Sequence, residues 1–219
     1  MTKRALIIGV KKTSLPGFSD QEIAVNNDLQ LINNLLINNN WPEKSIKILQ
    51  NGQELIKETV LNEMLQLALS ANPGDQMLLY YSGHGTEHTF RETTAQSLIL
   101  NDAYLFDYEI RKIFRKANPA SFFIALFDCC HSGTIIDFSP KINFPATLYM
   151  GACKDSEKAV SYPGGSLFTS TIYNLKQQVP QISYSELKNQ LSLNIHKPEP
   201  VFTVYEVSRS YLDKTIAFN

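Results

Sequence analysis

Short apolar runs alternate with longer amphipathic segments along most of the chain. Six runs have the length and composition of buried β-strands: residues 5–10, 45–49, 77–81, 121–127, 146–151 and 201–207. Apolar residues at helical spacing predict a helix capped by Ser19 or Asp20 and ended by residues 38–42, and further helices over residues 54–70, 107–117, 167–177 and 184–193. Strands that alternate with helices predict an α/β fold in one domain, residues 1–219, with a mostly parallel sheet covered on both faces.

Two of the predicted strands end in reactive side chains. The run at residues 121–127 leads directly into Asp128, Cys129, Cys130, His131, Ser132 and Gly133, and the run at residues 77–81 into Ser82, Gly83, His84 and Gly85. The carboxyl ends of neighbouring parallel strands meet at one edge of a sheet, so His84 and Cys130 should emerge together. A thiol and an imidazole at that edge are a cysteine nucleophile and its proton carrier. Residues 86–102, polar with a late apolar patch, predict a hairpin over this site.

The overall composition limits the function classes. With 219 residues, 43% of them apolar and 19% charged, the chain can bury a full core. A net charge of −1 does not suggest binding to nucleic acid or to an anionic membrane, and no apolar run reaches transmembrane length. Residues 5–10 are too short for the core of a signal peptide. Three cysteines, two of them adjacent, do not make a disulfide framework, so we expect a reducing, cytoplasmic location.

The cysteines and histidines also admit structural interpretations. Neighbouring residues that leave a strand point to opposite sides, so Cys130 should face His84 while Cys129 faces the core. Cys153 follows another predicted strand and is expected to be structural. A zinc site is a weaker alternative because adjacent cysteines rarely bind one zinc ion with good geometry; its candidate ligands are His84, His88, Cys129, Cys130 and His131.

Together the two turns resemble the active-site motifs of the caspase–metacaspase family of cysteine peptidases. Tyr-Ser-Gly-His-Gly at residues 81–85 and Asp-x-Cys-His-Ser-Gly at residues 128–133 are the metacaspase forms, whereas caspases carry Gln-Ala-Cys at the nucleophile. His84 precedes Cys130 by 46 residues (130 − 84), close to the caspase spacing of about 50. Weaker similarity covers nearly the entire chain, at residues 5–9, Asn27-Asp28, Gly165 and Phe168-Thr169.

This resemblance to the metacaspase/orthocaspase type implies a caspase-like three-layer α/β/α sandwich. It implies Cys130 as nucleophile and His84 as general acid/base, with the backbone amides of Gly85 and Cys130 holding the oxyanion. The pocket for the residue on the amino side of the cut (the S1 pocket) would be formed by Asp28, Asp128 and Ser82. Two carboxylates there repel an acidic side chain and pair with a basic one, so we expect cleavage of protein or peptide substrates after Arg or Lys.

The resemblance also bears on calcium and on processing. Many metacaspases bind calcium through several aspartates, and Asp107 and Asp137 match two such ligands, but Tyr108 stands where a paired aspartate belongs. We therefore expect no required cofactor and at most a weak calcium dependence. The connection between the Cys130 turn and residue 146 is short, so we expect an uncut active chain, although Lys141 offers a self-cleavage site. We expect a monomer or weak oligomer.

Two functions from other classes remain alternatives. A catalytically silent scaffold or regulator with the same fold would have no reason to retain Cys130, His84 and both pocket aspartates. A thiol acyltransferase would share the Cys-His pair but would not need an acidic pocket. A panel of peptide substrates distinguishes all three.

Overall fold

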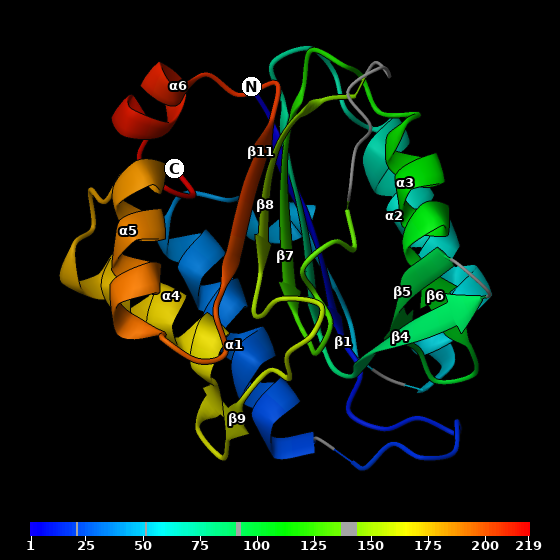
Figure 1. Cartoon of the computed structure of the whole chain (residues 1–219). Helices are drawn as coiled ribbons and strands as arrows, with labels where there is room; N and C mark the ends of the chain where they lie inside the picture. Colours follow the sequence, from blue (N-terminus) through cyan, green and yellow to red (C-terminus); the bar gives the residue numbers. More distant parts are fainter. Residues whose placement is uncertain (21, 51, 91–92, 137–143) are drawn as a thin grey trace.

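A six-stranded sheet forms the middle layer of the molecule in the computed structural model, which describes residues 1–20, 22–50, 52–90, 93–136 and 144–219 (Figure 1). Each neighbouring pair of strands is parallel except β11 and β8, which run antiparallel. The strands in spatial order are β11 (Val201–Tyr205), β8 (Ala146–Gly151), β7 (Phe122–Asp128), β3 (Gln76–Ser82), β1 (Lys3–Gly9) and β2 (Ile46–Leu49). The mostly parallel sheet expected from the sequence is therefore confirmed.

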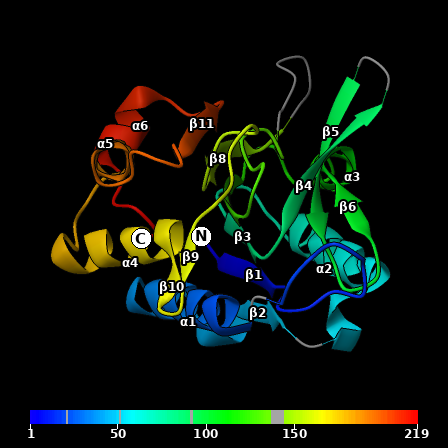
Figure 2. The ribbon, with the colours of Figure 1, turned by 60° about the horizontal axis from the view of Figure 1, so that its bottom comes forward.

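Helices cover both faces of this sheet, as Figures 1 and 2 show from two directions. One layer contains α1 (Glu22–Asn38), α4 (Leu167–Gln178) and α5 (Tyr184–Asn194), with the short α6 (Arg209–Lys214) beside α5; the other contains α2 (Lys57–Leu69) and α3 (Asp107–Phe114). Alternate strand residues enter the two cores: Ile7 and Leu78 pack with the α1 layer, and Leu6 and Leu79 with the α2 layer. The three-layer α/β/α sandwich is thus the observed architecture.

The two central strands carry the site. All seven residues of β3 and all seven of β7 are buried, as expected for parallel strands covered on both faces. The two strands pair in register, with Tyr81 opposite Phe127 and Ser82 opposite Asp128. Because both strands end at this level, the turns that follow them leave the sheet at the same edge.

A smaller antiparallel sheet follows the first of these turns. It consists of β4 (Gly85–Phe90), β5 (Thr93–Ile99) and β6 (Tyr104–Phe106), so the hairpin predicted over residues 86–102 is present and gains a third strand. This sheet packs beside α3, on the α2–α3 side of the molecule (Figure 2). The hairpin expected over the site lies beside the His84 turn, where the Ile99 N–H donates to the His84 carbonyl oxygen, and its described residues do not line the small cavity beside Cys130.

Several element ends differ from the sequence prediction. The helix predicted over residues 54–70 begins as a 3₁₀ turn, η2 (Gly52–Leu55), and α2 starts only after Ile56, whose backbone is extended. β11 ends at Tyr205 because Glu206 adopts a left-handed conformation with φ 55°. Within the described residues, the sequence pattern missed five short elements, which span too few residues for a periodicity: η1 (Glu43–Ser45), β6, β9 (Ser161–Tyr162), β10 (Gly165–Ser166) and α6.

Candidate active site

The turns that follow β3 and β7 lie against each other. The Gly83 N–H donates to the carbonyl oxygen of Asp128 at 3.3 Å. The backbone of Gly85 packs so closely on the Cys130 peptide that a Cβ at residue 85 would overlap the Cys130 carbonyl oxygen. A glycine is therefore required at residue 85, and the structure brings the His84 turn and the Cys130 turn together as the sequence predicted.

The two adjacent cysteines occupy different environments. Cys129 is 1% exposed and belongs to the core on the α2 side, whereas Cys130 is half-buried and lines a small cavity at the sheet edge. Burial raises the pKa of the Cys130 thiol and the nearby Asp128 carboxyl raises it further, while the Ala159 amide and the Lys158 ammonium oppose the shift. The Cys130 thiol is thus neutral at rest and needs a base to become a nucleophile.

His84 contacts the loop that precedes α1 and contains Ser19, one of the two residues predicted to cap this helix. Its Nε2 atom lies 2.7 Å from the Ser19 carbonyl oxygen, and its ring packs against Phe18 with 5.2 Å between ring centroids. A carbonyl oxygen only accepts hydrogen bonds, so Nε2 carries the proton and the lone pair of the neutral ring is on Nδ1. Within the described part of the chain no hydrogen bond joins His84 to the Cys130 thiol; such contacts often form only when substrate binds.

One of the two amides expected to hold the oxyanion, that of Gly85, faces out of the neighbouring ladder. The Ile99 N–H donates to the His84 carbonyl at 3.0 Å, and Gly85 stands opposite Leu98 in the next pair. In an antiparallel ladder this arrangement makes Gly85 and Leu98 a non-hydrogen-bonded pair, so the Gly85 N–H points away from β5. The Cys130 N–H faces its own sulfur atom.

Two buried carboxyl groups line the cavity beside Cys130. Asp28 on α1 is 1% exposed and Asp128 at the end of β7 is 4% exposed, and the cavity has a volume of about 30 Å³. The Ser82 hydroxyl donates to Asp28 Oδ2 at 2.8 Å. Ser166 connects the two acids, because its N–H donates to Asp28 Oδ1 at 2.7 Å and its hydroxyl donates to Asp128 Oδ2. All three residues expected in the S1 pocket therefore meet beside Cys130.

These two acids oppose each other's ionisation. Burial, followed by the charge of Asp28, raises the pKa of Asp128 to about 7. Burial also raises the pKa of Asp28, against the hydrogen bonds from Ser166 and Ser82. Near neutral pH Asp128 is therefore only partly ionised, and a cation placed between the acids would favour the release of its proton.

Sequence reasoning missed several residues that hold this site together. Ser166 and Thr169 at the start of α4 donate hydrogen bonds to Asp128. Thr169 had been noted only as part of the weak family resemblance, without a role, and Ser166 had not been noted. Asp155 accepts hydrogen bonds from the N–H (3.0 Å) and hydroxyl (2.7 Å) of Thr134 in the nucleophile turn. No local pattern signals these roles, since each joins segments far apart in the chain.

The residues considered for metals have other partners. The buried Asp107 carboxylate accepts hydrogen bonds from Arg111 at 2.7 Å and from the Tyr108 N–H at 2.6 Å. His88 contacts the Ser97 hydroxyl at 2.9 Å, and His131 Nδ1 donates to the Asp155 carbonyl oxygen. Over the described ranges, no group of three or more His, Cys, Asp and Glu residues could hold a metal ion. Asp137 and Lys141 lie outside the described residues.

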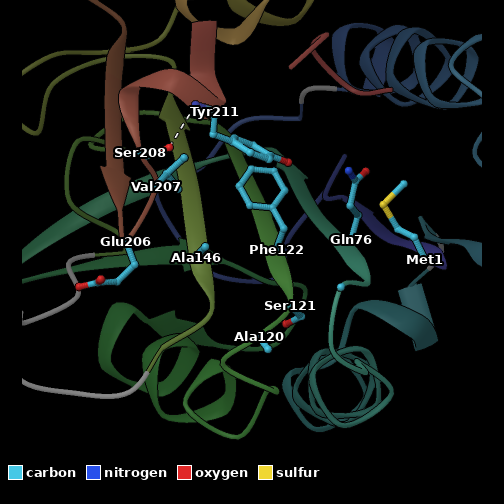
Figure 3. A pocket seen from close by; sticks show the side chains of 11 residues that line it. Met1, Gln76, Ala120, Ser121, Phe122, Ala146, Glu206, Val207, Ser208 and Tyr211 are labelled. Atoms are coloured by element: carbon cyan, nitrogen blue, oxygen red, sulfur yellow. Dashed lines mark hydrogen bonds between the residues drawn. The ribbon is translucent and has the colours of Figure 1, made fainter. Parts of the chain in front are cut away.

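A larger cavity of about 410 Å³ lies at the opposite end of the sheet (Figure 3). It is lined by the first residues of β3, β7 and β8 and by α6. The ring centroids of Phe122 and Tyr211 are 5.1 Å apart. Neither a cysteine nor a histidine lines this cavity, so the reactive groups belong to the small cavity at the carboxyl edge.

No helix in the described part of the chain is long and apolar enough to cross a membrane.

The three-layer sandwich with these turns at the carboxyl edge of its sheet has the features of the caspase-like cysteine peptidases. Residues 3–139, more than half of the chain, match the family model described as "Metacaspase, peptidase C14 domain", and the chain belongs to this family.

Curated relatives show the same family. Metacaspase-1 of Eremothecium gossypii is 30% identical over 152 residues, covering 62% of this chain and 33% of that protein. Metacaspase-1 of Debaryomyces hansenii is 27% identical over 237 residues, covering 98% of this chain and 53% of that protein. Metacaspase-5 of Trypanosoma cruzi is 32% identical over 91 residues, covering 37% and 20%. The chain thus spans from about a fifth to about half of the length of these relatives.

Two solved structures share the fold. A crystal structure of a protein from Geobacter sulfurreducens superposes with a TM-score of 0.83 at 15% identity, covering 100% of this chain and 98% of that chain. Caspase-1 from Spodoptera frugiperda superposes with a TM-score of 0.66 at 13% identity, covering 92% and 85%. At these identities the likeness establishes the caspase-like fold alone.

Proposed function

We propose that this chain is a cysteine endopeptidase that uses Cys130 and His84 to cleave peptide bonds after Arg or Lys. Membership of the metacaspase family supports peptide hydrolysis by a thiol. The observation that carries the specificity is the pair of buried carboxyl groups, Asp28 and Asp128, in a cavity that Cys130 also lines. The substrates are proteins or peptides, and the active form is a monomer or weak oligomer. All three cysteines are free thiols, which agrees with the reducing cytoplasm that we propose as its location.

In the proposed mechanism His84 first acts as a base. Its Nδ1 takes the proton of the neutral Cys130 thiol while the Ser19 carbonyl holds the Nε2 proton. The thiolate attacks the scissile carbonyl carbon, and the amides of Gly85 and Cys130 donate to the oxyanion that forms. The imidazolium then protonates the leaving amine as the C–N bond breaks. Water, deprotonated by His84, hydrolyses the resulting thioester and restores the thiol.

In the proposed S1 pocket the acids select the substrate side chain. A basic side chain is neutralised by Asp28 and Asp128 and displaces the proton of Asp128, whereas an aspartate side chain brings a third carboxylate into a buried site. A cavity of about 30 Å³ has room for little more than one water molecule, so the segments that line it must move apart when a basic side chain enters.

The catalytic pair is tested with three single variants. Cys130→Ala and His84→Ala should each lower kcat/KM on an Arg peptide at least a thousandfold with the circular dichroism spectrum unchanged, because each removes a reacting group. Cys129→Ala is the matched control: it removes the adjacent thiol, which faces the core, and should keep most of the activity. Full activity in folded Cys130→Ala protein would rule out the assignment.

The specificity is tested with fluorogenic peptides that differ only in the residue before the cut. We expect Arg and Lys to be cleaved and Asp to be cleaved negligibly, and Asp28→Asn and Asp128→Asn each to lower kcat/KM for Arg about a hundredfold. Faster cleavage after Asp than after Arg contradicts the proposal. A folded chain that cleaves none of the peptides, and whose Cys130 is not labelled by an arginyl electrophile, supports the scaffold alternative.

A further inference from the structure

The hydrogen bonds to Asp128 converge on one of its two oxygen atoms. Oδ2 accepts from the Thr169 hydroxyl at 2.5 Å, from the Thr169 N–H at 3.2 Å and from the Ser166 hydroxyl. Both donor residues lie at the start of α4, where Ser166 is the N-cap. The Asp128 carboxylate is therefore hydrogen-bonded to the start of α4 through Oδ2.

Tyr80 is the third residue of this hydrogen-bond network. The Tyr80 hydroxyl lies 2.7 Å from Thr169 Oγ1. Thr169 has one hydroxyl hydrogen, and when Asp128 is ionised that hydrogen must go to the carboxylate, which can only accept. Tyr80 is then the donor to Thr169. Both residues are 0% exposed, and burial together with Asp28 and Asp128 raises the pKa of Tyr80, so its hydroxyl keeps its hydrogen.

The other oxygen of Asp128 is left for the cavity. No hydrogen bond from the described residues reaches Oδ1. Across the same residues, Gln76 Oε1 is the only fully buried side-chain nitrogen or oxygen without a partner, so Asp128 Oδ1 is not sealed in the core. Because Asp128 lines the cavity beside Cys130, its open oxygen is the one that a substrate side chain can reach.

We propose that Thr169, supported by Tyr80, is a specificity-determining positioning residue: it holds Asp128 Oδ2 so that Oδ1 faces the basic side chain of the substrate. This inference rests on the proposed cleavage after Arg or Lys. Thr169 does not touch the substrate; it acts through Asp128. Its hydroxyl fixes the rotation of the carboxylate and stabilises the charged form, which the surrounding burial disfavours.

The inference is tested by removing single hydroxyl groups. Thr169→Val keeps the shape of the side chain and removes the donor, Thr169→Ser keeps the donor, and Tyr80→Phe removes only the supporting hydroxyl. The matched control is Thr171→Val on the same helix, whose hydroxyl donates to the Leu167 carbonyl oxygen at 2.7 Å. For each variant, kcat and KM are measured with two peptides that carry Arg or Gln before the cut.

We expect Thr169→Val to lower the Arg-to-Gln ratio of kcat/KM about tenfold, mainly through a higher KM for the Arg peptide, because a hydrogen bond to a charged group is lost. Thr169→Ser should stay within about threefold of the wild type, Tyr80→Phe should lower the ratio about threefold, and Thr171→Val should leave it unchanged.

An unchanged ratio in Thr169→Val, or an equal loss on both peptides, overturns the inference. If Thr169→Val does not fold, Tyr80→Phe decides in the same way, with Tyr184→Phe as the control for a buried tyrosine hydroxyl away from the site, where it accepts the Phe218 N–H at 3.0 Å. A wild-type chain without preference for Arg disproves the proposed function itself. That result is distinct from a preference that survives these substitutions, which disproves only the role of Thr169.

Discussion

At the scale of single residues, two carboxyl groups lie in the protein interior, where burial disfavours their charged forms. Asp28 and Asp128 are nearly fully buried and share Ser166 as a hydrogen-bond donor. The folded state holds a proton on Asp128 up to a pKa of about 7, whereas an unfolded chain releases it near the ordinary aspartate pKa of 3.8. Folding therefore binds a proton between these two pH values, and stability must decrease as the pH rises through that range.

We predict that the free energy of unfolding of the substrate-free protein falls between pH 5 and pH 7. For one proton the slope is at most about 1.4 kcal/mol per pH unit. Asp128→Asn should flatten this slope and gain stability relative to the wild type as the pH rises, because the amide has no proton to release. Urea denaturation at several pH values measures the slope.

Asp75→Asn is the control for this prediction. The Arg4 side chain and the Thr2 and Asn72 N–H groups hold the pKa of Asp75 at about 2, despite its burial. This stabilisation is lost only as the pH falls towards 2, so the variant should be less stable at pH 5–7 with the wild-type slope. A slope that Asp128→Asn leaves unaltered would contradict the assignment of the buried proton.

At the scale of elements, the nucleophile turn depends on a second loop for its shape. His131 has a left-handed backbone with φ 54°, which is unfavourable for a non-glycine residue. Asp155, in the loop after β8, holds this turn through Thr134, and its carbonyl oxygen accepts from His131. Gly133 packs so closely that a Cβ there would lie 2.8 Å from the Asp155 amide nitrogen. The loop after β8 thus holds the backbone of the turn that contains Cys130.

We predict that Asp155→Ala lowers kcat on an Arg peptide about tenfold or more, with a loss of about 1–3 kcal/mol in unfolding free energy. The turn loses two acceptors, so the thiol is no longer held in one orientation towards His84. Steady-state kinetics and urea denaturation measure the two effects.

Asp75→Ala serves as the comparison, since it also removes a carboxylate that accepts hydrogen bonds from the backbone, but at the opposite end of β3. It should lose similar stability and keep its kcat. An equal kcat in Asp155→Ala and the wild type would show that the turn keeps its shape without Asp155.

At the scale of the whole molecule, the site forms where the strand ends meet one helix layer. The strands supply Ser82 and Asp128, the turns that follow them supply His84 and Cys130, and α1 and the start of α4 supply Asp28 and Thr169. Of the two residues expected to bind calcium, Asp107 on α3 is paired with Arg111, and Asp137 lies outside the described residues. That the fold needs no calcium to position the site stays a prediction.

We predict that activity on an Arg peptide changes less than about twofold in a calcium chelator, and that millimolar calcium leaves the thermal unfolding midpoint unchanged, because a ligand that does not bind the native state cannot stabilise it. Magnesium at equal ionic strength is the control for non-specific charge screening. A large loss of activity in chelator, restored by calcium, would show that a calcium site is formed.

Interactions between residues close in the sequence could be predicted from the order of amino acids, and long-range interactions could not. Buried strands and amphipathic helices follow from the order of apolar and polar residues within a few positions, so the sheet, its helices and the turns at Cys130 and His84 could be predicted. The pairing of Asp28 with Asp128 came from motif resemblance, not from periodicity, because these residues are 100 positions apart (128 − 28). Element ends at Ile56 and Glu206 depended on single backbone conformations that no hydrophobic pattern records.

The groups that hold the reactive residues come from distant parts of the chain and are identified only in the folded molecule. The hydrogen bonds from Ser166 to Asp28 and from Tyr80 to Thr169 span 138 and 89 positions, and the one from His84 to the Ser19 carbonyl spans 65. Their partners are a hydroxyl or a backbone atom, groups that occur throughout the chain. Such atoms gain a role only when folding removes water and leaves one partner within reach, so their assignment requires the packed sheet and helices.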